Sequence, residues 1–287
     1  MKKILVAAAA YAAVSMAVPA QASDFNSVQT DQFVADFAPT EGKKYGVLVL
    51  GGSEGGKPKD LATKISDMGY PVLSLAYFKE EGLPQELNEI PLEYFDAPKD
   101  WLQARADTKD DGVIIVGWSK GAELSLLLAS RDPSYKGVMA IAPSSVVWAG
   151  ILKDWTKIPS SSWTVGGEPM AHVPFAQGVQ INSLVDLYEA SLKQETFAEK
   201  AVIPAENIRG SVLLMSGGMD EIWPAGMMAD DVCKRMEAAG GSCSHAHYPD
   251  AGHLLNPDYP IGGTDEGNKK AGVDSTAKMK AFLKKLN

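Results

Sequence analysis

The chain alternates short apolar runs with longer stretches in which apolar residues recur every three or four positions. Near-continuous apolar runs are typical of strands in a parallel sheet covered on both faces, and the stretches between them have the period of amphipathic helices. This alternation predicts an α/β domain built from βαβ units, with a mostly parallel sheet and helices on both faces. The expected strands are residues 45–50, 71–76, 112–116, 137–142, 211–215 and 244–248, and the expected helices are residues 60–68, 98–106, 121–130, 183–200, 227–239 and 275–286.

Two segments lack a clear period. Residues 23–44 are polar and are expected to form a lead-in to the domain at residues 45–287. Residues 143–182, called the insertion below, hold Trp148, Trp155 and Trp163 among Gly, Pro and Ser. A long stretch of this kind in a compact domain is usually a lid or a binding loop, although a helix pair packed on the sheet is an equally good interpretation.

The first 22 residues have the pattern of an export signal. Lys2 and Lys3 precede an apolar stretch at residues 4–18, and residues 20–22 read Ala-Gln-Ala, a small-residue cleavage motif. The apolar stretch is shorter than the roughly 20 residues that a membrane-spanning helix needs. We therefore expect residues 1–22 to be removed, and the mature protein to be periplasmic or secreted without a membrane span.

Composition narrows the choice of partners. The net charge of −9 at pH 7 opposes binding to polyanions, so nucleic acid is not an expected partner.

The two cysteines, Cys233 and Cys243, lie close together in a chain expected to be exported. They either form a local disulfide or serve as two small buried apolar residues. The oligomeric state does not follow from the sequence.

The strongest chemical signal is a serine between two glycines at the junction of a strand and a helix. The apolar run at residues 113–116 leads into Gly-Trp-Ser-Lys-Gly, and a helical pattern follows. In a nucleophile elbow the serine adopts a strained backbone conformation, and small residues two positions before and after it let strand and helix approach. Gly117 and Gly121 meet this requirement. We therefore predict that Ser119 is a nucleophile at the positive end of the helix.

A serine hydroxyl needs a base to activate it and a carboxylate to orient that base. When the nucleophile lies on such an elbow, the acid and then the histidine follow it in the chain. Asp220 and His253 each follow an expected strand, so they should lie at the same sheet edge as Ser119. Glu221 and Asp250 are rival candidates for the acid. The sequence predicts an α/β-hydrolase fold with Ser119, Asp220 and His253 as its catalytic triad.

Two backbone amides are expected to bind the oxyanion of an acyl-transfer reaction. One belongs to Lys120, the residue after the nucleophile. The second should come from the loop at residues 51–56, which reads Gly-Gly-Ser-Glu-Gly-Gly, with Ser53 as the first choice and Glu54 as the second. The loop has neither the spacing of a dinucleotide fingerprint nor that of a Walker motif, so nucleotide binding is not expected.

The other histidines do not indicate a metal centre. His245 and His247 alternate within an expected strand and share one face, but no third ligand is evident, so packing within the strand is the better interpretation. His172 lies in the insertion, where a surface position is the simpler interpretation. We expect no metal and no organic cofactor.

Several sequence blocks resemble the acyl-CoA thioesterase and bile acid-CoA:amino acid N-acyltransferase family, which is related in fold to the dienelactone hydrolases. The similarity covers about residues 45–260, and its most specific blocks are Leu-Ala-Tyr-Phe at residues 75–78 and Tyr-Pro-Asp-Ala-Gly-His at residues 248–253; the other matching blocks are residues 51–56, 82–84, 90–95 and 116–123.

The resemblance implies cleavage of acyl thioesters through a covalent acyl-enzyme, with the nucleophile, acid and base at Ser119, Asp220 and His253. The amino-transferring members use cysteine as nucleophile, so Ser119 favours transfer of the acyl group to water. The family's amino-terminal β-sandwich domain is not expected ahead of residue 45.

The sequence therefore predicts an exported serine hydrolase acting on a small-molecule thioester or ester. A carboxylesterase specific for oxygen esters and an inactive binding protein of the same fold are the alternatives. Trp118, Trp148 and Trp223 are candidate substrate-binding residues, because aromatic side chains suit an apolar acyl pocket. An exported enzyme would rarely meet cytoplasmic acyl-CoA, so the acyl and leaving groups stay open.

Overall fold

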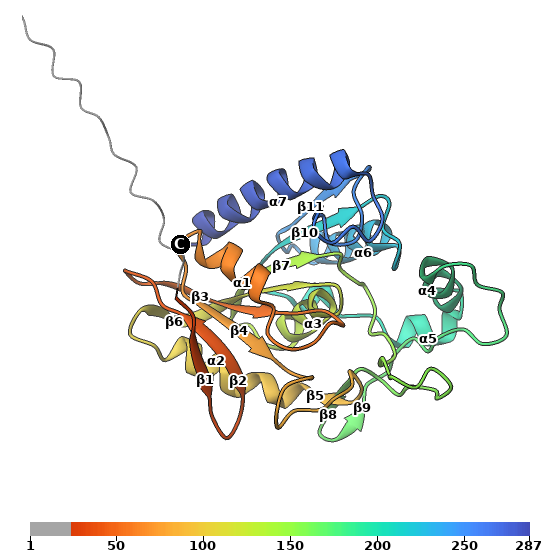
Figure 1. Ribbon diagram of the computed structural model, residues 1–287, viewed down its shortest axis with the longest axis horizontal. Helices are drawn as coiled ribbons and strands as arrows, with labels where there is room; N and C mark the ends of the chain where they lie inside the picture. The colour runs from red at the N-terminus through yellow and green to blue at the C-terminus, as the bar shows by residue number, and fades with distance from the viewer. Residues whose placement is uncertain (1–23) are drawn as a thin grey trace, which may run out of the picture.

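A computed structural model describes residues 24–287 of the chain. Its centre is an eight-stranded sheet with the strand order β1-β2-β4-β3-β6-β7-β10-β11 (Figure 1). The first two strands run antiparallel to their neighbours, and all the other pairs are parallel. The strands are β1 (Asn26–Gln29), β2 (Val34–Ala38), β3 (Lys44–Leu50), β4 (Val72–Ala76), β6 (Thr108–Trp118), β7 (Tyr135–Ile141), β10 (Ser211–Gly217) and β11 (Cys243–Tyr248).

Helices cover both faces of this sheet (Figure 1). Helices α1 (Lys59–Ser66) and α7 (Asp265–Leu286) pack on one face, where Leu61 and Leu283 join its apolar core. The other face carries α2 (Asp96–Gln103), α3 (Lys120–Arg131) and α6 (Ala225–Ala238), and α3 is buried along nearly its whole length because it crosses the middle of the sheet. The remaining helical elements are α4 (Leu184–Leu192), α5 (Glu195–Lys200) and the 3₁₀ turns Leu92–Phe95 and Ala205–Asn207.

The predicted α/β class and mostly parallel sheet are confirmed, and every expected strand is present. The strand ends shift by two residues or fewer, except that β6 begins at Thr108 and not at the expected residue 112. The expected helices differ in two places. The helix expected at residues 183–200 is divided into α4 and α5. The last helix begins earlier than expected, at Asp265, because the hydroxyl of Thr264 accepts a hydrogen bond from the Gly267 amide (2.9 Å) and caps the helix there.

The segment at residues 23–44, expected to be a lead-in, contributes β1 and β2 to the main sheet. In β2 the side chains of Ala35 and Phe37 are buried and alternate with partly exposed neighbours. Phe37 packs edge-on against Trp101 of α2, with ring centroids 5.2 Å apart. The prediction of a lead-in without regular structure was therefore wrong for these residues.

The insertion at residues 143–182 contains no helix, so the interpretation as a helix pair was wrong. Part of it forms a small sheet in the order β5-β8-β9, where β8 (Trp163–Val165) pairs with β5 (Ile90–Pro91) and with β9 (Glu168–Pro169). Trp148 and Trp163 are fully buried, whereas Trp155 is 73 % exposed. The insertion is thus packed onto the domain, and its role as a cover for substrate stays a prediction.

Cys233 of α6 and Cys243 of β11 form a disulfide, which decides between the two interpretations of this pair. The predicted signal peptide at residues 1–22 lies outside the described residues. Within residues 24–287, no helix combines the length and the apolar character needed to cross a bilayer.

Candidate active site

Ser119 lies on a strained turn between β6 and α3. Its backbone torsions are φ 52° and ψ −121°, a region that non-glycine residues rarely adopt. A Cβ at Gly117 would lie 2.2 Å from the carbonyl oxygen of Gly121, and a Cβ at Gly121 would lie 2.3 Å from the carbonyl oxygen of Gly51. Neither glycine can therefore be replaced without moving backbone, as the elbow motif predicts. The second contact also brings the loop after β3 against the elbow.

Asp220 and His253 form a buried pair at the carboxyl ends of β10 and β11. His253 Nδ1 lies 2.7 Å from Asp220 Oδ2, and the two side chains are 2 % and 3 % exposed. The other carboxylate oxygen, Oδ1, accepts hydrogen bonds from the amides of Ile222 (2.8 Å) and Trp223 (3.1 Å). Because the carboxylate is held on both oxygens, it orients the imidazole with Nδ1 as the donor and Nε2 as the basic nitrogen.

The basic nitrogen of His253 is buried and has no hydrogen-bond partner within residues 24–287. Ser119, which is buried, lies at the same edge of the sheet, but its hydroxyl makes no hydrogen bond to His253 in this structure. Catalytic hydrogen bonds of this kind often form only when substrate is bound. The structure thus joins two members of the predicted triad and places the third on its elbow. The rival acids Glu221 and Asp250 are exposed, and neither makes a hydrogen bond to the His253 ring.

The glycine loop at residues 51–56 lies against the elbow. A side chain at Gly52 would place its Cβ 3.1 Å from Cβ of Ser119. The buried hydroxyl of Tyr77 donates to the carbonyl oxygens of Gly51 (2.7 Å) and Gly52 (3.3 Å) and so fixes the loop. Burial, reinforced by nearby carboxylates, raises the pKa of Tyr77 well above its ordinary value, so the hydroxyl keeps its proton and remains a donor.

The amides predicted to bind an oxyanion remain candidates. The N–H groups of Lys120, Ser53 and Glu54 donate to no other group of residues 24–287. The ammonium of Lys79 instead binds the carbonyl oxygens of Ser53 (3.1 Å) and Glu54 (3.0 Å) and supports the loop from outside. Gly52, which the sequence does not single out, donates its amide to the carboxylate of Glu54 (2.8 Å).

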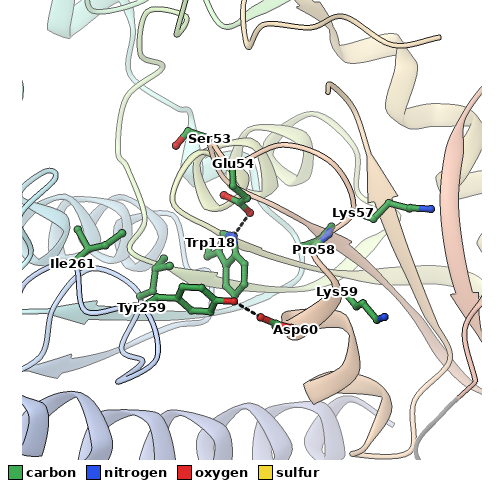
Figure 2. Close-up of a pocket in the computed structure, with 10 residues that line it drawn as sticks. Ser53, Glu54, Lys57, Pro58, Lys59, Asp60, Trp118, Tyr259 and Ile261 are labelled. Atoms are coloured by element: carbon green, nitrogen blue, oxygen red, sulfur yellow. Dashed lines mark hydrogen bonds between the residues drawn. The ribbon is translucent and has the colours of Figure 1, made fainter. Parts of the chain in front are cut away.

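A cavity of about 510 Å³ opens beside the elbow (Figure 2). Trp118 and Leu254, the chain neighbours of Ser119 and His253, both line it. The Glu54 carboxylate lies in this cavity and accepts a hydrogen bond from the Trp118 indole (2.6 Å; Figure 2). The remaining lining residues are Ser53, Lys57, Pro58, Lys59, Asp60, Tyr259 and Ile261. The cavity is therefore a candidate subsite for a substrate whose reacting carbonyl lies at Ser119.

The candidate substrate-binding tryptophans have different environments. Trp118 lines the cavity of Figure 2, and its role in substrate binding stays a prediction. Trp148 and Trp223 are fully buried, and their rings stack on each other at 14° with centroids 6.3 Å apart. The ring of Trp223 in turn packs edge-on against His253 at 5.5 Å. These two residues form a packed wall behind the histidine, and neither side chain is open to solvent.

His245 and His247 share one face of β11, and both contact the hydroxyl of Ser216, at 2.7 Å from Nε2 and 2.9 Å from Nδ1. His245 also binds Asp230 through Nδ1 (2.7 Å). His172 is half-buried and lies 3.1 Å from the carbonyl oxygen of Met170. The part of the chain that the structure describes contains no group of three or more His, Cys, Asp or Glu side chains arranged to hold a metal ion.

Three residues that contact the site could not be assigned from the sequence. Tyr77 and Lys79 hold the glycine loop, and Glu123 forms a buried ion pair with Lys120 under the elbow. Tyr77 and Glu123 did carry a signal, because they lie in the blocks at residues 75–78 and 116–123 that carry the family resemblance, but the resemblance assigned no role to either. Lys79 and Glu123 act through side chains whose partners are set by the tertiary fold.

Comparison with known proteins decides the family. The sequence profile described as "BAAT / Acyl-CoA thioester hydrolase C terminal" matches residues 90–266, which is more than half of the chain. The chain belongs to this family. The resemblance predicted from the sequence blocks is thereby confirmed. Membership in the BAAT and acyl-CoA thioester hydrolase family supports hydrolase chemistry for the chain.

In the alignments with curated relatives, about a quarter of the aligned residues are identical to those of this chain. Acyl-coenzyme A thioesterase 2 of mouse mitochondria is 26 % identical over 264 residues, covering 86 % of this chain and 56 % of the relative. Human acyl-coenzyme A thioesterase 1 is 27 % identical over 274 residues, covering 86 % and 61 %. Mouse acyl-coenzyme A amino acid N-acyltransferase 1 is 26 % identical over 222 residues, covering 77 % and 51 %. The chain thus spans little more than half the length of these relatives.

Solved structures confirm that this chain has the α/β-hydrolase fold. A putative dienelactone hydrolase from Klebsiella pneumoniae superposes with a TM-score of 0.58 at 18 % identity, covering 91 % of this chain and 97 % of the other. A sugar hydrolase from Lactococcus lactis gives 0.61 at 14 % identity, covering 92 % and 100 %. At these identities the likeness concerns the fold alone.

Proposed function

We propose that the protein is a serine hydrolase that cleaves an acyl thioester or ester through an acyl-Ser119 intermediate. The observation that carries this proposal is the buried His253–Asp220 pair, whose free imidazole nitrogen lies at the sheet edge that also bears the strained Ser119 elbow. Membership in a family of acyl-CoA thioester hydrolases supports the reaction class.

The chain's own groups account for both halves of the reaction. His253 Nε2 takes the proton of the Ser119 hydroxyl as its oxygen bonds to the substrate carbonyl carbon. The amide of Lys120 and one from the glycine loop hold the resulting oxyanion. The bond to the leaving group then breaks, and His253 returns the proton to the departing sulfur or oxygen. Water, activated by the same imidazole, attacks the acyl-serine and releases the acid.

Replacing Ser119 with Ala tests the mechanism. We expect turnover of short p-nitrophenyl esters and acyl thioesters to fall by roughly three orders of magnitude or more, because the nucleophile is lost. A slow acylating substrate should add its acyl mass to the wild-type protein at Ser119. Ser216→Ala is the matched control, because Ser216 also contacts a histidine but is fully buried. Full turnover by Ser119→Ala would rule out the acyl-serine mechanism.

The proposed substrate class, a thioester, follows from the relatives of the chain. The relatives named as acyl-coenzyme A thioesterases favour a thioester, and a parallel panel of oxygen esters and thioesters with the same acyl chain separates thioesterase from carboxylesterase. If the purified protein neither turns over these substrates nor reacts with a fluorophosphonate at Ser119, the alternative of an inactive binding protein holds instead.

We also propose that the protein is exported. The leader-like pattern of residues 1–22 supports export, and so does the Cys233–Cys243 disulfide, because such bonds persist mainly in oxidising compartments. Mass spectrometry of the protein from the periplasmic or extracellular fraction of an expressing bacterium should give a chain that begins at Ser23. Full-length protein confined to the cytoplasm would contradict export.

A further inference from the structure

A buried ion pair lies directly beneath the elbow and is not used by the proposed reaction. Lys120 Nζ lies 2.6 Å from Glu123 Oε2, and the two side chains are 1 % and 0 % exposed. Removing two charges from water is expensive, and an apolar pair of similar size often stabilises a fold at least as well. The pair therefore calls for an explanation other than the stability of α3.

The second oxygen of the same carboxylate binds the insertion. Glu123 Oε1 accepts a hydrogen bond from the indole of Trp163 (2.8 Å) and one from the backbone amide of Trp148 (3.3 Å). The ammonium of Lys120 also lies 5.5 Å from the centroid of the Trp163 ring, within the range of a cation–π contact. One carboxylate thus joins the first turn of α3 to two points of the insertion.

The insertion carries this connection to the proposed base. The Trp148 ring stacks on Trp223, and Trp223 packs edge-on against His253. Trp223 also donates its backbone amide to Asp220, the residue that orients His253. Glu123 is therefore connected to the elbow through Lys120. It is connected to His253 through the contacts of Trp148 and Trp223.

The charges of the pair depend on each other. Burial lowers the pKa of Lys120 and raises the pKa of Glu123, and the attraction between the two groups opposes both shifts. Removing one partner leaves the other charge buried without a counter-charge, which destabilises the fold more than removing both.

We propose that Glu123 is a positioning residue for acyl transfer. Through the Lys120 side chain, its carboxylate sets the direction of the Lys120 backbone amide that is expected to bind the oxyanion. Through Trp148 and Trp223, it sets the wall against which the His253 ring packs. This inference rests on the proposed serine hydrolase function and deepens it.

Trp163→Phe is the sharpest test, because it removes the indole N–H that donates to Glu123 and leaves an aromatic ring at this position. Active sites are titrated with a fluorophosphonate, and kcat is expressed per titrated site, so that unfolded protein does not count. We expect kcat per site to fall roughly tenfold, as for the loss of a hydrogen bond to a charged group, while KM changes less than threefold. Trp155→Phe is the matched control at an exposed indole and should match the wild type.

Glu123→Gln tests the charge and keeps an oxygen that can accept from Trp163. Its kcat per titrated site should fall about tenfold to a hundredfold, since Lys120 loses its counter-charge. The double variant Lys120→Met, Glu123→Gln should regain melting temperature relative to Glu123→Gln, because no buried charge is left unpaired, and should remain as slow, because no ion pair orients the backbone amide of residue 120. If Glu123→Gln does not fold, Trp163→Phe decides the question.

Unchanged kcat per titrated site in Trp163→Phe would overturn the inference and leave the proposed function intact, as would full recovery of kcat in the double variant. A wild-type protein that neither turns over substrate nor reacts with the fluorophosphonate would overturn the proposed function and the inference together. The wild-type measurement therefore distinguishes the two failures.

Discussion

His253 Nδ1 and Asp220 Oδ2 lie 2.7 Å apart with both side chains buried, and the second oxygen of the carboxylate is held by two backbone amides. Asp220→Asn would offer an amide N–H to Nδ1 and so favour the imidazole tautomer that cannot accept a proton from serine. We expect kcat to fall by roughly 10³–10⁴ with little change in KM, measured with a p-nitrophenyl ester. Glu221→Gln, at the exposed neighbour, should retain full turnover; an active Asp220→Asn would contradict the assignment.

Trp118 combines a place in the cavity wall with a hydrogen bond to Glu54 (2.6 Å). Trp118→Phe removes that hydrogen bond and lets the carboxylate move within the cavity. We expect KM to rise roughly three- to tenfold while kcat stays within a factor of three, because the loss affects binding more than the reacting atoms. Steady-state kinetics check this, with Trp155→Phe as the control. An unchanged KM would show that substrate does not use the cavity.

The elbow requires glycine at position 121 for steric reasons. Gly121→Ala would place a methyl group 2.3 Å from the carbonyl oxygen of Gly51, so we expect a loss of about 3 kcal/mol or more in the free energy of unfolding. Gly240→Ala is the control, because its Cβ meets open space and only its positive φ is unfavourable, which costs about 1 kcal/mol. Urea denaturation measures both. Equal losses would refute the steric argument.

The disulfide between Cys233 and Cys243 ties α6 to the edge strand β11. Replacing both cysteines with Ala should lower the free energy of unfolding by about 2–4 kcal/mol, since the unfolded chain is no longer cross-linked. Activity per folded molecule should be unchanged, because neither cysteine lines the cavity. Denaturation of both proteins with and without a reductant gives the comparison, and a wild type insensitive to the reductant would contradict it.

Asp132 should make stability depend on pH in the acid range. Burial alone would raise its pKa, but hydrogen bonds from Lys99 (2.5 Å) and the Ser134 amide (2.8 Å) outweigh burial and lower the pKa. Because the folded-state pKa is depressed, the stabilisation is complete above the unfolded-state value of about 3.8 and is lost as pH falls through the folded-state pKa.

Asp132→Asn should therefore destabilise the protein at pH 7 by about 1 kcal/mol, a value discounted for partial exposure. The difference between variant and wild type should shrink steadily below about pH 4. Urea denaturation across this pH range measures it. A difference that stays constant down to the acid limit would show that the carboxylate does not contribute through its charge.

Local signals explain how much of the fold and site the sequence could predict. The elbow at Ser119 was predictable because its glycine requirement acts over only a few residues. Inner strands such as β4 and β7 were predictable because both of their faces are buried, which leaves long apolar runs. Strand β2 was missed because it is short and only Ala35 and Phe37 alternate clearly into the core. So brief a pattern also occurs by chance in irregular chain.

The features of the site that the sequence did not predict depend on contacts between distant segments of the chain. The sequence does not indicate that Trp148 of the insertion stacks on Trp223 and is buried there. Nor does it indicate that Trp118, by contrast, lines the cavity. Likewise, a helix pattern shows that Glu123 lies one turn after Lys120 but not that both are buried. Burial of a charged side chain becomes visible only when its partner across the fold is known.

Tyr77 has a geometric consequence for the peptide planes of the glycine loop. In a trans peptide the N–H points away from the C=O of the same unit. Because the phenol draws the Gly52 oxygen to its own side, the N–H of Ser53 must face the opposite side of the chain. A half-turn of that single plane would present an oxygen where a donor is needed, so one phenolic proton keeps the polarity of the loop from inverting.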